Sequence, residues 1–387
     1  MIYLDNAATS WPKPEIVYET MESFLREKGG NPGRASHSLA IAAGSAIEEA
    51  RILAAQLINA PDKNRVIFTL NCTDALNLGL KGLLKPRDHV ITDRIGHNSV
   101  VRPLAKLEQQ GVEVTRLEPR SEDGYLSAQD IENAIIEDTK LIVVTHASNV
   151  TGVIQQIKDY GATARKYGLI LMVDAAQTAG TYPIDVQDDN IDLLALSGHK
   201  GLLGPTGTGI LYVGERADLD SMREGGTGSR SELEEQPTEL PQRYESGTPN
   251  TVGIAGLGAA LRYILDQGID KIRTHEVSLT DHLLDEIAQI PQITVYGPKD
   301  STKQVAIFSF NVDGWEPAEV GAILDQSFDI KVRTGLYCAP SAHKTFGTFP
   351  VGSVRIGLGY FNTHEEIEFT LEALKKIAGS KINKGKI

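Results

Sequence analysis

The sequence predicts an α/β protein with a mostly parallel β-sheet, followed by a smaller α+β region. Short, β-branched runs alternate with longer amphipathic stretches along the first part of the chain, as in repeated βα units. The runs are also apolar throughout, which is typical of strands covered by helices on both faces. At 387 residues the chain can bury a large core and is long enough for about two to three domains.

The first part supplies the elements of the large sheet. Helical stretches are predicted at 99–110, 128–137 and 159–167, because their apolar residues recur with a helical period. The predicted strands are 66–69, 90–92, 141–145, 169–173, 193–196 and 209–213. We therefore expect an α/β domain over residues 15–250.

The pattern changes after residue 251. The predicted helices there are 252–267, 270–288, 317–328 and 363–378, and the predicted strands are 294–296, 305–311, 331–333 and 354–357. After the first two helices the order is β, β, α, β, β, α, which indicates a small α+β domain. Before the change, the segment 225–242 is polar and rich in Gly, Ser and Glu. Such long segments between helices and strands are usually functional or mobile.

Composition excludes several classes of partner. The net charge of −13 argues against nucleic acid. No apolar run approaches the roughly 20 residues that span a bilayer, and residues 1–11 lack the basic and apolar regions of a signal peptide. Two cysteines make neither a disulfide framework nor a zinc site. We expect a cytoplasmic protein with no metal, no membrane and no nucleic-acid partner.

The residues that follow the predicted strands are the candidates for chemistry, because ligands of open α/β sheets bind beyond the carboxyl ends of the strands. In chain order these residues are Thr73, His97, Asn149, Asp174 and Lys200. Thr73 is a candidate N-cap of the next helix, whose N-terminus suits an anion. Lysine can form a Schiff base, and an aspartate facing a pyridinium nitrogen is the other half of pyridoxal 5'-phosphate (PLP) chemistry.

With these residues in place, the chain resembles the class V aminotransferase family of PLP enzymes. Within that family it resembles the cysteine desulfurases, most of all the group II (SUF-type) branch with its selenocysteine lyases. The match covers nearly the whole chain, and its most specific pieces are 197–200 (Ser-Gly-His-Lys), 204–207 (Gly-Pro-Thr-Gly), 245–250 (Glu-Ser-Gly-Thr-Pro-Asn) and 333–338 (Arg-Thr-Gly-Leu-Tyr-Cys). The resemblance implies the type I PLP fold, a homodimer with active sites at the subunit interface, and a small domain of residues 1–14 and 251–387.

The resemblance also implies roles for single residues. Lys200, Cys338 and His97 are the expected catalytic residues: Lys200 would hold PLP and move the Cα proton, and His97 would stack on the ring. Asp174 would pair with the ring nitrogen, and Arg355 would bind the substrate carboxylate, with a strand-end ion pair as the alternative. The other expected cofactor contacts are Thr73, Asp74, Asn149, Gln177, Ser197, His199 and, toward the neighbouring subunit, Thr248; Asn149 is also expected to contact substrate.

Cys338 decides the function that the resemblance implies. As a thiolate it would attack the sulfur of L-cysteine, or the selenium of L-selenocysteine, and leave alanine and a persulfide for an acceptor protein or thiol, as in iron–sulfur cluster assembly. Arg333, His343 and Lys344 are expected to favour the thiolate, whereas Cys72 is interpreted as structural or incidental. The alternatives are a selenocysteine lyase, a cystine or cysteine lyase, another class V enzyme, or a non-catalytic binding protein. We expect segment 225–242 to shape docking of the acceptor.

Overall fold

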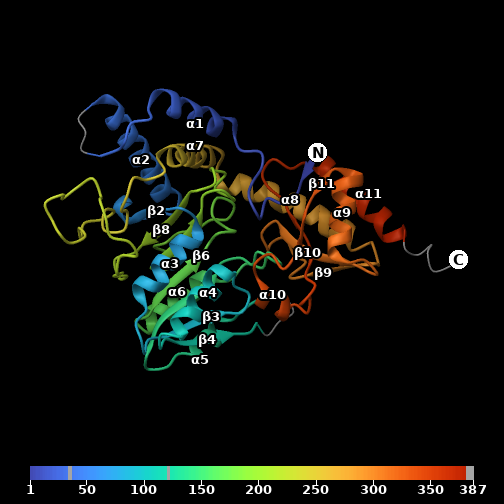
Figure 1. Cartoon of the computed structure of the whole chain (residues 1–387). Helices are drawn as coiled ribbons and strands as arrows, with labels where there is room; N and C mark the ends of the chain where they lie inside the picture. The colour runs from blue at the N-terminus through green and yellow to red at the C-terminus, as the bar shows by residue number, and fades with distance from the viewer. Residues whose placement is uncertain (34–36, 120–122, 381–387) are drawn as a thin grey trace.

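The computed structural model describes residues 1–33, 37–119 and 123–380. Its larger layer is a seven-stranded sheet in the order β2, β8, β7, β6, β5, β3, β4 (Figure 1). These strands are β2 (Val66–Thr69), β3 (His89–Asp93), β4 (Glu113–Leu117), β5 (Thr139–Thr145), β6 (Ile170–Asp174), β7 (Leu193–Ser197) and β8 (Gly209–Val213). Only β8 runs against its neighbours within this sheet, so the prediction of a mostly parallel α/β sheet is confirmed.

The edge strand β4 is absent from the sequence-based assignment. Its sequence, Glu-Val-Thr-Arg-Leu, is not a continuous apolar run, and its side chains are half-buried or exposed. An edge strand is covered less completely than a central one, so it does not need the apolar run by which the others were found. The inner strands are buried at nearly every position.

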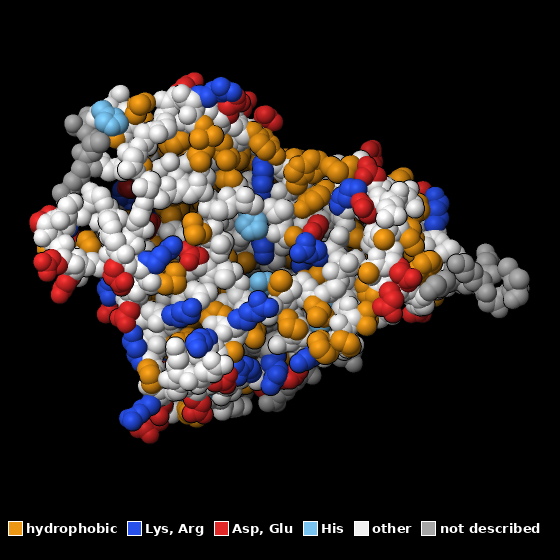
Figure 2. Space-filling model, viewed as in Figure 1, with side chains coloured by type: hydrophobic (Ala, Val, Ile, Leu, Met, Phe, Trp, Pro, Cys, Tyr) orange, Lys and Arg blue, Asp and Glu red, His pale blue; other side chains and the backbone are white. Residues whose placement is uncertain are grey.

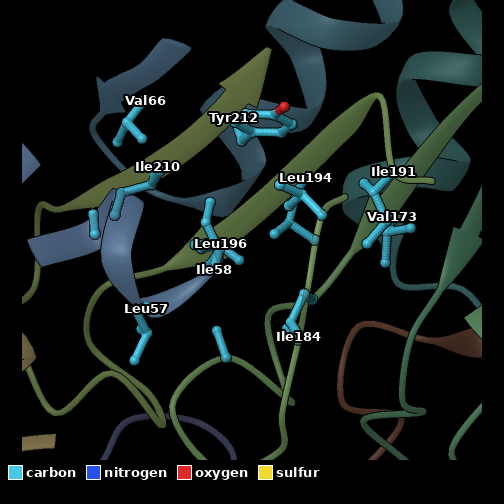
Figure 3. Close-up of a cluster of buried hydrophobic side chains, with 14 of the residues drawn as sticks. Leu57, Ile58, Val66, Val173, Ile184, Ile191, Leu194, Leu196, Ile210 and Tyr212 are labelled. Atoms are coloured by element: carbon cyan, nitrogen blue, oxygen red, sulfur yellow. The ribbon is translucent and has the colours of Figure 1, made fainter. Parts of the chain in front are cut away.

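Both faces of the large sheet are covered, and neighbouring residues of one strand enter different cores. Ile142 and Val144 of β5 belong to one cluster, whereas Leu141 and Val143 belong to another on the opposite face. Figure 3 shows part of the first cluster, where Leu194 and Leu196 of β7 pack with Ile58 at the end of α2 (Ser38–Leu57). This two-sided burial is the physical reason for the uninterrupted apolar runs.

The helices of the larger layer agree in part with the prediction. Those expected from the periodicity are α4 (Asn98–Glu108), α5 (Ala128–Asn133), α6 (Ile157–Lys166) and α7 (Thr251–Gln267). The helix expected near Thr73 is α3 (Cys72–Leu83), whereas α1 (Glu15–Glu27), α2 and a short 3₁₀ helix at Lys63–Arg65 were not predicted. Helices α1 and α2 pack against α7 (Figure 1).

A second, antiparallel sheet has the order β12, β13, β10, β9. Its strands are β9 (Ile293–Tyr296), β10 (Ile307–Val312), β12 (Arg333–Gly335) and β13 (Ser353–Gly357), and the helices around it are α8 (Ile269–Ile287), α9 (Pro317–Phe328), α10 (Pro340–Thr345) and α11 (His364–Ser380). The N-terminal strand β1 (Ile2–Tyr3) pairs with β11 (Ile330–Lys331), and Leu4 belongs to the core of this second sheet. The domain boundary near residue 250 stays a prediction.

The strand predicted at 331–333 is wrong as a single element. Lys331 pairs with Tyr3 in the two-stranded sheet, whereas Arg333 pairs with Arg355 in the four-stranded sheet. The chain therefore changes sheets at this point, and only long-range pairing could reveal the break. The polar segment 225–242 holds no helix or strand. None of the described helices is long and apolar enough to cross a membrane.

Candidate active site

A cavity of about 240 Å³ lies beyond the carboxyl ends of the central parallel strands, where they meet the second sheet. All of the predicted site residues except Asp74 and Thr248 line this cavity. They come from segments that are far apart in the chain, from Thr73 to Arg355. Figure 2 shows histidine side chains near the middle of one face of the molecule, with Lys and Arg side chains around them. The predicted convergence at the strand ends is therefore present in the fold.

The expected anion end of the cavity is built on the first turn of α3. Asn71, in an extended conformation, is the N-cap: its side chain accepts a hydrogen bond from the Asp74 backbone N–H at 2.9 Å. The prediction that Thr73 caps this helix is thus wrong, because Thr73 already lies inside it. Thr73 instead lines the cavity. The carboxylate of Asp74 lies outside the lining and pairs with Arg223 at 3.0 Å.

The loop after β7 approaches other backbone segments very closely. A β-carbon at Gly198 would lie 2.1 Å from Thr208 Oγ1, so only glycine fits between Ser197 and His199. Burial, together with the charges of Lys200 and Lys13, lowers the pKa of His199 to about 4, and its ring is therefore neutral near pH 7. The Nδ1 atom of His199 is buried without a hydrogen-bond partner among the described residues.

Lys200 shares the cavity with a carboxylate and a thiol. Burial lowers the pKa of Lys200, and the nearby charge of Asp174 opposes that shift. Asp174, at the end of β6, accepts hydrogen bonds at Oδ1 from the Ala176 N–H at 3.0 Å and from the Cys72 thiol at 3.5 Å. Burial and Asp174 raise the pKa of Cys72, which keeps it protonated as a weak donor. Cys72 therefore lines the site, which the sequence alone did not indicate.

His97 is held by the first turn of α4. It caps the helix: its Nδ1 accepts from the Ser99 backbone N–H at 3.0 Å and lies 2.8 Å from the Ser99 hydroxyl. Because a backbone N–H can only donate, the neutral ring carries its proton on Nε2. The Ser99 hydroxyl also lies 2.6 Å from the Thr73 hydroxyl. Ser99 was not predicted, although a hydroxyl two residues after His97 is a signal that could have found it.

Arg355, on β13, is almost completely buried. Its Nη2 pairs with Asp5 at 2.9 Å and its Nη1 donates to the Asn149 carbonyl at 2.9 Å. Burial lowers the pKa of Arg355, and Asp5 opposes that shift. The strand-end ion pair weighed as an alternative is therefore present, yet Arg355 also lines the cavity. Its Nε and the Asn149 Oδ1 are buried without hydrogen-bond partners among the described residues.

Cys338 is exposed and lies on a turn between β12 and α10. Tyr337 and Cys338 both have left-handed backbones, with φ of 44° and 58°, a conformation that costs of order 1 kcal/mol for each non-glycine residue. The Cys338 carbonyl accepts from the Asn98 N–H at 2.8 Å, which joins this turn to α4.

The basic surroundings expected for Cys338 are only partly present. Arg333 lines the cavity, and Lys344 is exposed on α10. His343, by contrast, is buried against Thr348, and burial lowers its pKa to about 4. The expectation that His343 favours a thiolate is therefore wrong, because a neutral imidazole supplies no positive charge.

The remaining predicted residues are placed as follows. Gln177 donates to the Ala7 carbonyl at 3.1 Å and lines the cavity. Thr248 is exposed and lines a separate pocket with Arg223 and Gly207. The described residues include no group of three or more His, Cys, Asp or Glu side chains that could hold a metal ion.

Comparison with known proteins assigns the chain to a family. The family model for class-V aminotransferases matches residues 2–369. The chain belongs to the class-V aminotransferase family. A probable cysteine desulfurase of Methanothermobacter thermautotrophicus is 36% identical, over 98% of this chain and 95% of that protein. A cysteine desulfurase of Salmonella agona is 35% identical, over 97% and 93% of the two chains.

Solved structures agree with the sequence comparison. A cysteine desulfurase from Thermococcus onnurineus superposes with a TM-score of 0.91 at 34% identity, covering 98% of this chain and 95% of that chain. A cysteine desulfurase from Escherichia coli superposes with a TM-score of 0.85 at 28% identity, covering 97% and 94%. The predicted membership of class V and its fold are thus confirmed.

Proposed function

We propose that this class-V protein is a PLP-dependent cysteine desulfurase. The observation that carries the proposal is an exposed cysteine, Cys338, that lines the same cavity as Lys200 and the buried Asp174, whose charge acts on the Lys200 amine. The names of the relatives, at about 35% identity over nearly the full length, support the same reaction. The proposed products are alanine and a persulfide on Cys338.

The residues that line the cavity fit PLP. The anion end offers the first turn of α3 with Thr73 and the unpartnered Nδ1 of His199, which suit a phosphate. Asp174 would face the ring nitrogen, His97 would lie on the ring, and Asn149 with Gln177 would contact the phenolic side. The assigned contacts also include Ser197, with Thr248 reaching a neighbouring subunit. When bound, PLP would supply an electron-accepting ring that stabilises negative charge at the substrate Cα.

Three side chains of the protein would then bind the substrate, transfer its proton and donate a hydrogen bond. Arg355 holds the substrate carboxylate through the guanidinium donors that Asp5 and Asn149 leave free. Lys200 takes the Cα proton, which is consistent with the lowered pKa that burial imposes on its amine. His97 presents its Nε2 proton, so it is a donor in this tautomer.

Cys338 would attack the sulfur of the substrate as a thiolate. A sulfur–sulfur bond forms, the carbon–sulfur bond of the substrate breaks, and its electron pair remains on the carbon skeleton, which takes up protons to become alanine. A second thiol must afterwards remove the sulfur from Cys338. We propose that this acceptor is a protein or small thiol, and that segment 225–242 shapes its docking.

The decisive experiment compares the purified protein with its Cys338→Ala variant. Both receive L-cysteine and a thiol reductant, and alanine and sulfide are measured. Equal amounts of alanine and sulfide from the wild type, with loss in a variant that keeps its PLP colour, support a desulfurase acting through Cys338. Alanine and sulfide surviving in the variant would point to a lyase-type release, and pyruvate with ammonia would identify a cysteine lyase. Selenide from L-selenocysteine alone would identify a selenocysteine lyase.

We also propose that the protein is a cytoplasmic homodimer. Thr248 is exposed and outside the cavity of its own chain, as a residue that completes a neighbouring site would be. Sedimentation equilibrium should give twice the mass of the chain. Mixing a Lys200→Ala chain with a Thr248→Ala chain should restore one intact site per mixed dimer, and no complementation would contradict the shared site.

A further inference from the structure

The backbone around Cys338 has an unfavourable conformation, so contacts with surrounding residues must stabilise it. Tyr337 and Cys338 both lie in the left-handed region, which non-glycine residues seldom adopt because their Cβ crowds the backbone. Such residues persist where their surroundings over-determine them. The turn itself contributes one backbone hydrogen bond, from the Ala339 N–H to the Leu336 carbonyl at 2.8 Å.

Tyr337 joins this turn to other parts of the protein through several contacts. Its side chain is buried, with 7% of its surface exposed. Its hydroxyl lies 3.0 Å from the Ser353 hydroxyl and also donates to the Ser353 carbonyl on β13. Burial raises the pKa of Tyr337, so the phenol keeps its proton as a donor. The side chain thus anchors the turn to the second sheet.

Tyr337 also contacts the arginine proposed to bind the substrate. The Arg355 guanidinium lies over the Tyr337 ring, 4.8 Å from its centre. The Tyr337 carbonyl accepts from Asn149 Nδ2 at 2.8 Å, and the Asn149 carbonyl accepts from Arg355 Nη1 at 2.9 Å. Tyr337, Asn149 and Arg355 therefore each contact the other two. Cys338 directly follows Tyr337 in the chain.

We propose that Tyr337 is a positioning residue that fixes Cys338 relative to Arg355, its hydroxyl holding the turn and its ring orienting the guanidinium. This inference rests on the proposed function, in which Arg355 and Cys338 act on opposite ends of one small amino acid. A substrate of that size spans both groups only if their separation is constant. The hydroxyl of Tyr337 then affects mainly kcat, and its ring affects mainly KM.

Two variants separate the parts. Tyr337→Phe keeps the ring over Arg355 and removes the hydroxyl, so kcat for alanine should fall about threefold to tenfold while KM for L-cysteine stays within about twofold. Tyr337→Leu removes both parts, so KM should also rise about fivefold or more. Tyr296→Phe is the matched control: it removes a hydroxyl that bonds Asn311 at 3.3 Å on the same sheet, outside the cavity lining.

Hydrogen exchange provides a readout that does not depend on turnover. The amide of Ala339 closes the turn, and the amide of Asn98 bonds the Cys338 carbonyl. Both should exchange faster in Tyr337→Phe than in the wild type or in Tyr296→Phe, whereas amides of the large sheet should not change.

Unchanged exchange at Ala339 and Asn98 in Tyr337→Phe would overturn the proposal. A uniform loss of protection along the chain would overturn it as well, because that would indicate a general structural role. If the wild type makes no alanine from L-cysteine, the proposed function fails, and the exchange measurement still decides whether Tyr337 holds the turn. Equal effects of Tyr337→Phe on kcat and KM would contradict the division between hydroxyl and ring.

Discussion

The two sides of the cavity are built in different ways. On the strand-end side, Asp174 and Lys200 follow regular parallel strands, and burial shifts the pKa of Lys200. On the other side, the turn of the proposed nucleophile (residues 336–339, the nucleophile turn) is left-handed at two positions and leaves Cys338 exposed. Groups that hold a cofactor gain from burial, because burial adjusts their protonation. In the proposed function Cys338 passes sulfur to a second molecule and has to stay accessible, so its position depends on backbone contacts instead.

The largest expected effect is on the strand-end side. Lys200→Ala should lower alanine formation by more than about 10³-fold, because in the proposed function the variant loses both the cofactor link and the base. Borohydride reduction followed by mass spectrometry should find PLP attached to residue 200 in the wild type only. Lys81→Ala, an exposed lysine on α3, is the control and should behave as the wild type. A variant with normal turnover would break the assignment.

A large loss of stability is expected where the two sides meet. Asp5→Ala leaves the Arg355 guanidinium, which is 3% exposed, without its carboxylate at 2.9 Å. Breaking a buried ion pair typically costs about 3–5 kcal/mol, which urea unfolding would measure. The matched control is Glu118→Gln, which breaks the exposed pair with Arg94 at 3.2 Å and should cost less than about 1 kcal/mol. Equal losses of unfolding free energy in the two variants would show that the burial of Arg355 does not make its ion pair more important for stability.

Acid should destabilise both sides, because each side holds at least one histidine whose pKa is lowered well below its usual value. The pKa is lowered from 6.5 to about 4 for His199 behind the strand ends and for His343 behind the nucleophile turn. Between pH 6.5 and about 4 the unfolded chain therefore binds more protons than the native one, so stability falls as the pH falls through this window. His199→Gln and His343→Gln should each flatten the pH dependence of urea unfolding. A slope unchanged in both variants would contradict buried, neutral rings.

The smallest effect is expected for the second thiol. Cys72 is buried, and its pKa is raised by burial and by Asp174, so a thiol reagent should label Cys338 in the native protein and leave Cys72 intact until unfolding. Cys72→Ala should change alanine formation by less than about threefold, since it removes only a weak S–H donor from Asp174. Rapid native labelling of Cys338→Ala would show that Cys72 is accessible after all.

Several parts of the site could be predicted from the sequence because they depend on local order. Parallel strands bring their carboxyl ends to one edge, so residues such as Asp174 and Lys200 converge wherever the strands pair. Uninterrupted apolar runs indicated the inner strands, because both faces of the sheet are covered. The family resemblance supplied Cys338 and Arg355, which no spacing along the chain connects to the strand ends.

Other features depended on the tertiary structure alone. The N-cap at Asn71, the change of sheets between Lys331 and Arg333, and the burial of His343 each rest on backbone geometry or contacts that a pattern of residue types does not encode. The contacts that define the nucleophile side join residues such as Asp5 and Arg355, 350 positions apart. The sequence alone therefore determined the fold class and which residues lie at the strand ends, since both follow from local periodicity and strand order. Tertiary packing decided which buried groups are paired, neutral or held in a left-handed turn, because those properties depend on neighbours that only folding brings together.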